Sequence, residues 1–182
     1  VDQVEREAQA WAERKGLLFR CTVAPDVPTR VQLDPLRLRQ VLTNLLSNAI
    51  KYTPVGEVNL KVTLGVPRPD APGTLPRETL LHFEVADTGT GIAPERLPVL
   101  FAPFAAADPA AGPVPEGSSG LGLSISRRLA SLMGDELLLD SAPGRGTRVR
   151  LSVPVPPISA AAPPAARATR EGAVLLCEDD PT

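Results

Sequence analysis

Several features are scarce in this 182-residue sequence, and each scarcity excludes a class of protein. No apolar run is long enough to cross a bilayer, and no charged-then-apolar leader opens the chain, so we expect a soluble, cytoplasmic domain without direct membrane contact. The net charge of −2 provides no general attraction to nucleic acid. The two cysteines, Cys21 and Cys177, belong to no paired metal-ligand spacing, which favours free thiols in a reducing compartment.

Aromatic residues are also rare, at 3%, whereas hydrophobic residues make up 43% of the chain. The core is therefore expected to be aliphatic, and the length is enough for one compact domain with some chain left over. The single histidine, His82, lies in a strand-like pattern over residues 80–85. We interpret it as a structural residue.

Hydrophobic periodicity predicts an alternation of helices and strands. Helices are expected over Asp2–Lys15, over residues 35–52 after the capping carboxylate Asp34 and Pro35, and over Gly120–Met133. The third helix is expected to bury one face, made of Leu121, Ile125, Leu129 and Leu132. Strands are predicted at Leu17–Val23, Arg30–Leu33, Glu57–Leu64, Leu80–Ala86, Glu136–Asp140 and Thr147–Val153, the last two joined by a hairpin turn.

Proline-rich stretches divide the sequence. Residues 65–77 are expected to form an exposed excursion between two strands, and residues 93–119 a long loop with one short helix over Glu95–Phe101. A compact domain is thus predicted over residues 1–155, followed by a Pro/Ala-rich linker over 156–171. Residues 172–182 contain an apolar strand that ends in three acids, which indicates the truncated start of another domain.

Two motifs carry candidate chemistry. Asn44, Asn48 and Lys51 share one helix face at spacing i, i+4, i+7, and they can offer oxygen ligands to Mg²⁺ and a positive charge to phosphate. The alternative is a solvated helix face. Asp87 follows an apolar strand and precedes Gly89 and Gly91, so its carboxylate can accept a hydrogen bond from an exocyclic amine. The alternative there is a strand-exit turn formed by aspartate.

A third motif, residues 117–123 (GSSGLGL), opens the last predicted helix. Small residues at a helix start expose backbone N–H groups that suit an anionic phosphate. The spacing differs from a P-loop because no Gly-Lys-Ser/Thr element exists, and no strand precedes Gly120 as in a Rossmann unit.

Taken together, these motifs resemble the catalytic, ATP-binding (GHKL-type) domain of sensor histidine kinases, over residues 1–155. Residues 44–53 (NLLSNAIKYT) resemble its N box, 87–92 (DTGTGI) its G1 box, 101–104 (FAPF) its F box and 120–123 (GLGL) its G2 box. The GRGT turn at residues 144–147 also matches. The resemblance implies an α/β (α+β) fold: a two-layer sandwich of Bergerat type, with a mixed, mostly antiparallel sheet, helices on one face and a mobile ATP lid.

The resemblance also assigns roles. Asn48 would ligand Mg²⁺ with support from Asn44, Lys51 would contact phosphate, Tyr52 would pack near adenine, and Asp87 would bind the adenine amine. Phe101 and Phe104 would anchor the lid, although they are equally expected to be core anchors under a loop. The remaining ATP contacts implied are Gly89, Gly91, Ile92, Ser119, Gly120, Leu121, Gly122, Leu123 and Thr147.

One position discriminates between the chemistries of this superfamily. Its gyrase, Hsp90 and MutL-type ATPases carry a glutamate four residues before the Mg-binding asparagine, where it activates water. Here that position is Asn44, which favours phosphoryl transfer to a protein. The expected acceptor is a histidine on a separate dimerisation domain, with a receiver domain or response regulator downstream, in a full-length protein that is compatible with a membrane anchor. The alternatives are a nucleotide-sensing module and an anti-sigma-factor-type serine kinase.

Overall fold

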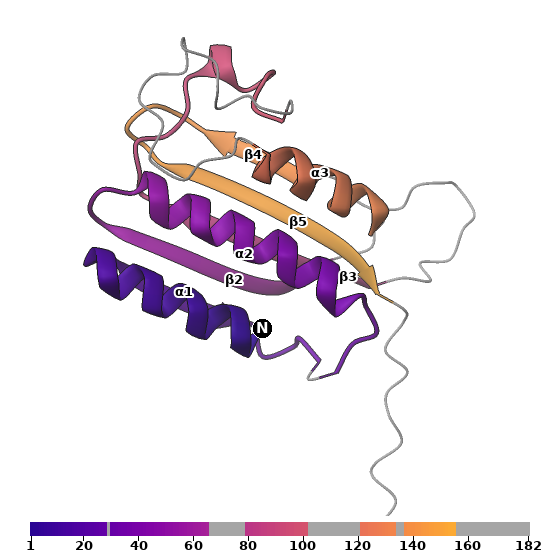
Figure 1. Ribbon diagram of the computed structural model, residues 1–182. Coiled ribbons are helices and arrows are strands. Elements are labelled where there is room, and N and C mark those ends of the chain that lie inside the picture. The colour runs from indigo at the N-terminus through magenta and orange to yellow at the C-terminus, as the bar shows by residue number, and fades with distance from the viewer. Residues whose placement is uncertain (29, 66–78, 102–120, 134–136, 156–182) are drawn as a thin grey trace, which may run out of the picture.

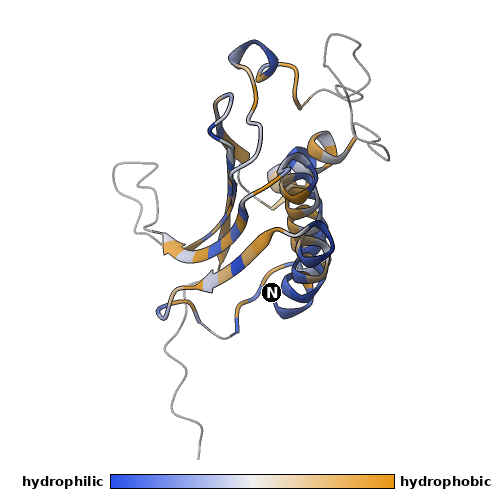
Figure 2. Ribbon diagram, turned by 90° about the vertical axis from the view of Figure 1, so that its left-hand side faces the viewer, coloured by the Kyte–Doolittle hydropathy of each residue, from blue (hydrophilic) through white to orange (hydrophobic). Residues whose placement is uncertain are grey.

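The computed structural model describes residues 1–28, 30–65, 79–101, 121–133 and 137–155. Within these ranges the chain forms two layers, a five-stranded sheet and a layer of helices on one of its faces (Figures 1 and 2). The helices are α1 (Asp2–Lys15), α2 (Pro35–Tyr52) and α3 (Gly122–Leu132), with a 3₁₀ turn, η1, at Pro94–Arg96. The strands are β1 (Leu18–Val23), β2 (Glu57–Gly65), β3 (Thr79–Asp87), β4 (Leu137–Ser141) and β5 (Thr147–Val155).

The sheet has the order β1-β2-β3-β5-β4. β1 and β2 are parallel and are connected through α2, whereas the other three pairs are antiparallel. This confirms the predicted mixed, mostly antiparallel sheet with helices on one face. The register aligns Val58 with Asp87 and Asp87 with Thr147, so the end of β3 lies beside the start of β5.

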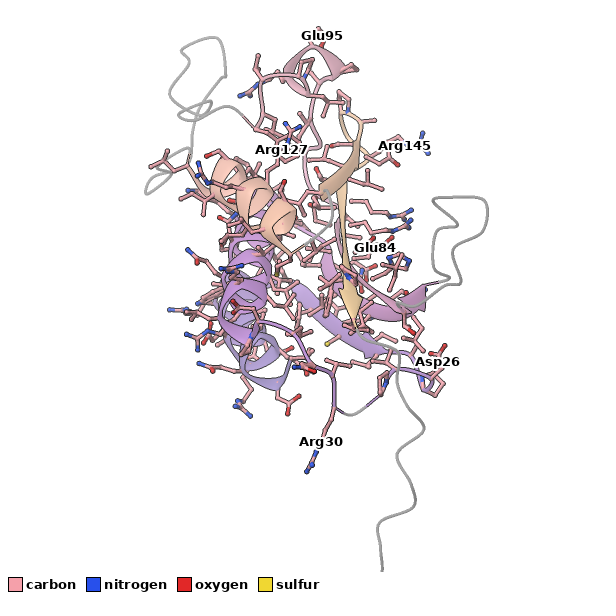
Figure 3. All side chains as sticks on the ribbon, turned by 90° about the vertical axis from the view of Figure 1, so that its right-hand side faces the viewer. Asp26, Arg30, Glu84, Glu95, Arg127 and Arg145 are labelled. Atoms are coloured by element: carbon pink, nitrogen blue, oxygen red, sulfur yellow. The ribbon has the colours of Figure 1, made fainter. Side chains whose placement is uncertain are left out.

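The core lies between the sheet and the helices, and the alternation of side chains along the strands creates it. On β2 and β3, Val58, Leu60, Leu81 and Phe83 are among the buried residues, and they face the buried side of α2. The other face of the sheet is polar. Glu84 lies on the side away from the helices (Figure 3) and pairs with arginines of β5, at 3.5 Å from Arg148 and 2.8 Å from Arg150.

The ends of two helices follow from local chemistry. Asp34 caps α2 by accepting hydrogen bonds from the backbone N–H groups of Leu36 (3.0 Å) and Arg37 (3.1 Å), as the sequence predicts. α1 ends at Gly16, whose φ of +70° is left-handed and favours glycine. α1 is an integral part of the domain because Val4, Ala8 and Ala12 are buried in the core.

Two predictions about local structure are wrong. Arg30–Leu33 forms no strand, because Val31 and Leu33 pack against the core while the backbone between them pairs with nothing in the described sheet. A short alternation of apolar residues does not distinguish these two outcomes. The short helix expected over Glu95–Phe101 is reduced to the 3₁₀ turn at Pro94–Arg96.

The predicted face of the third helix is also wrong in part. Ile125 is 42% exposed and Leu132 is 58% exposed, whereas Ser126 and Ala130 are buried. α3 lies close against α2, so small side chains occupy the contact and larger ones are displaced to its edges. The predicted excursion over 66–77 and most of the predicted long loop, residues 102–119, lie outside the described residues. No helix within the described ranges is long and apolar enough to cross a membrane.

Candidate functional site

The carboxylate of Asp87 is held in one orientation at the end of β3. Its Oδ1 atom accepts hydrogen bonds from the backbone N–H groups of Gly89, at 2.8 Å, and of Thr147, at 3.2 Å. Burial raises the pKa of Asp87, and these two hydrogen bonds oppose that shift. Within the described residues both bonds reach Oδ1, which leaves Oδ2 as the acceptor for an external donor.

The hydrogen bond from Gly89 forms an Asx-turn. Asp87 is therefore also a turn-forming residue, which is the alternative that the sequence left open. The bond from Thr147 is long-range, and an isolated turn does not require it. Asp87 therefore both shapes the strand exit and carries an oriented carboxylate.

The loop after Asp87 packs tightly against the end of α2. The Thr90 N–H group donates to the Tyr52 carbonyl at 3.2 Å, and a Cβ at Gly89 would overlap that same carbonyl oxygen. Gly91 has a φ of +69°, and a Cβ there would overlap the carbonyl oxygen of Ala142. Both glycines are thus required by contacts within the protein.

A serine that sequence reasoning missed joins this loop to the β4–β5 hairpin. The Ser141 Oγ atom accepts from the Ile92 N–H at 2.9 Å, donates to the Gly146 carbonyl at 2.9 Å, and lies 2.9 Å from the Thr147 hydroxyl. Ser141 thereby ties the loop after Asp87 to the hairpin turn and to Thr147, whose N–H group donates to the Asp87 carboxylate. The only signal in the sequence is a polar residue at the end of the apolar segment that forms β4. The structure then pairs Ser141 with Thr147 in the strand register.

The stripe Asn44, Asn48 and Lys51 lies on α2 as predicted, and its members have different surroundings. The Asn44 Nδ2 group donates to the Ser126 Oγ atom of α3 at 2.7 Å. Asn48 is half-buried, and its side chain makes no hydrogen bond within the described residues. Asn44 thus joins two helices, whereas the Asn48 carboxamide is available to a ligand.

The start of α3 contacts this stripe directly. A Cβ at Gly122 would overlap the Asn44 Oδ1 atom, which explains glycine at a position whose φ is not left-handed. Among the described residues, no side chain caps the first N–H groups of α3, and Leu123 packs against the core. The first turn of α3 therefore presents backbone donors beside α2 that no side chain of the described ranges caps.

Phe101 packs against the core, which agrees with its expected role as a core anchor under a loop. The guanidinium carbon of Arg127 on α3 (labelled in Figure 3) lies 5.2 Å from the centre of its ring, a cation–π distance. Phe104, Ser119 and Gly120 lie outside the described residues, so their expected contacts with ATP stay predictions. His82 lies in β3 with its Nδ1 atom 2.8 Å from the Ser152 Oγ atom, which fits the structural role predicted for it.

The site thus combines three elements: an oriented carboxylate, amide side chains on one helix, and an uncapped helix start. Among the described residues, no group of three or more His, Cys, Asp or Glu side chains is arranged to hold a metal ion. α2 contains no acidic residue along its 18 positions. The arrangement can bind a ligand that has both an amine donor and anionic oxygens, and α2 offers no carboxylate as a general base.

Comparisons with known proteins agree with this geometry. Residues 33–157 match the family described as histidine kinase-, DNA gyrase B-, and HSP90-like ATPase. The chain is 45% identical over 141 residues to the virulence sensor protein BvgS of Bordetella bronchiseptica, covering 76% of this chain and 11% of that protein. It is 39% identical over 142 residues to the sensor histidine kinase RcsC of Salmonella typhimurium, covering 78% of this chain and 14% of that protein.

A solved structure is similar as well. Full-length ShkA in complex with AMPPNP superposes with a TM-score of 0.68 at 30% identity, over 85% of this chain and 29% of that one. The chain therefore spans a small part of the proteins that it resembles.

Proposed function

Because the chain belongs to the family of histidine kinase-, DNA gyrase B- and HSP90-like ATPases, we propose that it is the ATP-binding catalytic domain of a hybrid sensor histidine kinase. In this role it binds Mg-ATP and transfers the γ-phosphoryl group to a histidine on a separate dimerisation domain. The observation that carries the proposal is Asn44, an amide bound to Ser126 at the position where the hydrolases of the superfamily keep a glutamate.

The Asp87 carboxylate supports adenine recognition. Its Oδ1 atom is engaged by two backbone donors, so the lone pairs of Oδ2 can accept the exocyclic amine of adenine. Tyr52, which is 39% exposed at the end of α2, offers a ring beside this loop. The AMPPNP bound to ShkA is an ATP analogue, which agrees with an adenine nucleotide as the ligand.

The phosphate end of the nucleotide would lie between α2 and the start of α3. Lys51 supplies a positive charge from α2, and the uncapped N–H groups at the start of α3 favour anionic oxygens. The Asn48 carboxamide fits Mg²⁺, which prefers oxygen ligands and takes most of its shell from phosphates and water. When bound, this ion would neutralise phosphate charge, while Asn48 fixes its place.

Transfer to a protein is favoured over hydrolysis by what α2 lacks. An attacking water needs a base within hydrogen-bond reach, and an asparagine cannot take a proton. The Nδ2 group of Asn44 is also committed to Ser126, and α2 offers no carboxylate in its place. The same pocket can then hold ATP until an acceptor side chain arrives.

The acceptor is proposed to lie outside this chain. His82 is held in a β-strand by Ser152, on the face of the sheet that is opposite the helices. It therefore cannot approach a phosphate at the helix layer. Residues 172–182, with the acidic pair Asp179 and Asp180, are proposed as the start of a receiver domain, which makes the full protein a hybrid kinase.

The decisive experiment mixes the 182-residue chain with the separately expressed upstream helical domain and γ-labelled ATP. Label on that domain that is acid-labile and alkali-stable identifies phosphohistidine and supports the proposal. The Asp87→Asn variant should strongly reduce the labelling, whereas Ser131→Ala, an exposed change on α3, should leave it intact. Acid-stable label on a serine would favour the serine kinase, and ATP binding without any label would favour the nucleotide-sensing module.

A further inference from the structure

The last turn of α2 is capped by residues from three parts of the chain. A helix leaves its final four carbonyls without partners in the helix. At this end, the Ala49 carbonyl accepts from the Thr53 hydroxyl at 2.7 Å. The Tyr52 carbonyl accepts from the Thr90 N–H group at 3.2 Å.

The two carbonyls between them are satisfied from α1. The Lys15 Nζ group donates to the Ile50 carbonyl at 2.7 Å and to the Lys51 carbonyl at 2.6 Å. Lys15 is the last residue of α1, and α1 and α2 end on the same side of the molecule (Figure 1). One ammonium group therefore lies at two helix C-termini, where the negative ends of both helix dipoles favour it.

The position of Lys15 is itself tightly determined. α1 packs through buried Val4, Ala8 and Ala12, and the Leu17 N–H group closes the helix by donating to the Ala12 carbonyl at 2.9 Å. Burial lowers the pKa of Lys15, in keeping with an ammonium group drawn against the protein. Lys15 thus transmits the position of α1 to the end of α2.

This end of α2 is where the candidate site begins. Lys51 and Tyr52 are its last two residues, and the Tyr52 carbonyl holds Thr90 and lies against Gly89. A shift of the last turn would therefore move a phosphate-binding side chain and the loop after Asp87 together. The Thr90 N–H group and the Thr53 hydroxyl cap this turn without connecting it to α1. Lys15 does connect it to α1.

We propose that Lys15 is a positioning residue of the nucleotide site, which holds the last turn of α2 in the geometry that binds Mg-ATP and couples the site to α1. Lys15 makes no contact with the nucleotide and acts through Lys51, Tyr52 and Thr90. The inference rests on the proposed function, since it specifies how that pocket is kept in order.

The test compares three variants of the 182-residue chain in calorimetric titrations with Mg-AMPPNP. Lys15→Met removes the donors and should weaken binding by at least about fivefold, the lower end of typical coupling between two sites. Lys15→Arg keeps a charged group with several donors and should restore most of the affinity. Arg14→Met is the matched control, because the Arg14 Nε group donates to Ala10 of its own helix and should leave binding unchanged.

A purely structural role gives a different result. In that case Lys15→Met lowers the melting temperature of the nucleotide-free protein but leaves the Kd unchanged at a temperature where all variants are folded. This outcome would overturn the positioning role while the proposed function stands. If the unmutated chain itself does not bind Mg-AMPPNP, the proposed function and this inference fail together.

A measurement on the unmutated chain covers the case in which Lys15→Met does not fold. Coupling is reciprocal, so Mg-AMPPNP should shift the side-chain NMR signals of Lys15 and slow amide exchange at Thr90. Arg14 serves again as the control and should show no shift. An unchanged Lys15 signal at saturating nucleotide would contradict the proposal.

Discussion

The Nδ2 group of Asn44 donates a 2.7 Å hydrogen bond to the Ser126 Oγ atom, and this contact joins α2 to α3 at the centre of the candidate site. Ser126 is 1% exposed, so its hydroxyl depends on Asn44 for a partner. A side chain proposed to decide between transfer and hydrolysis is thus also a structural link between two helices.

Gly122→Ala should therefore be destabilising, although alanine normally favours a helix. Its Cβ would overlap the Asn44 side chain, and we expect a loss of about 1–3 kcal/mol in the free energy of unfolding, as overpacking causes. Urea unfolding of Gly122→Ala, Asn44→Ala and the double variant forms a cycle that measures the coupling. Because Asn44→Ala removes the overlap, the added cost of Gly122→Ala should largely disappear in the double variant. Additive effects would show that the two residues do not compete for the same space.

On acidification, the affinity for ATP should decrease at a higher pH than it would if Asp87 had the pKa of an ordinary aspartate. The carboxylate of Asp87 must be ionised to accept the adenine amine, and burial raises its pKa above the usual value of about 3.9. In titrations with Mg-AMPPNP at successively lower pH, the unmutated chain should lose affinity at a higher pH than an unshifted aspartate would cause. Asp87→Asn provides the baseline, since its remaining pH dependence comes from the phosphates. Parallel curves for the two proteins would remove Asp87 from the binding step.

The same shift has a consequence for stability without nucleotide. A raised pKa means that the folded state binds the proton more tightly than the unfolded state does. The contribution of Asp87 is therefore fully present below the ordinary aspartate pKa, and it is lost as the pH rises through the raised value. In urea unfolding, the stability of the unmutated chain relative to Asp87→Asn should accordingly decrease as the pH rises from about 4 through the raised pKa of Asp87.

Ser141→Ala should damage the adenine side of the site. The change leaves the part-buried Ile92 N–H and Gly146 carbonyl without the hydroxyl that joins them, which we expect to cost about 1 kcal/mol, the lower end for an unsatisfied group. We expect that loss in urea unfolding, together with several-fold weaker binding of Mg-AMPPNP. Ser131→Ala, whose hydroxyl donates to Arg127 on an exposed helix turn, should change stability by less than about 0.5 kcal/mol. Equal effects of the two changes would argue against a special role for Ser141.

Cys21 should react slowly with alkylating reagents. Burial, with a further contribution from Glu5, raises the pKa of its thiol to about 11. In a Cys177→Ser background, the rate of alkylation by iodoacetamide should rise steadily from pH 8 towards pH 11, because the thiolate is the reactive form. Glu5→Gln should increase the rate at pH 8. A rate at pH 8 equal to that of the urea-unfolded chain would contradict the predicted protection.

The fold could be predicted wherever local chemistry decides it. The Asp34 and Pro35 helix start, the alternation of apolar residues in β2 and β3, and the glycine turn between β4 and β5 all appear in the structure. Arg30–Leu33 could not be predicted, because two apolar side chains fit a loop over the core as well as a strand. The prediction of which face of α3 is buried was wrong in part. Because α3 packs close against α2, only small side chains such as Ser126 and Ala130 fit at the contact.

The sequence by itself determined the family and its signature side chains, since Asn44, Asn48, Lys51 and Asp87 are read from motifs whose spacing is local. Only the tertiary structure decided what those side chains contact. Ser126, Ser141 and Lys15 reach the site from distant segments, and no pattern in their own surroundings marks them. The reason is physical: a motif records which groups a short segment offers, whereas the packing of helices against a sheet fixes which donor meets which acceptor.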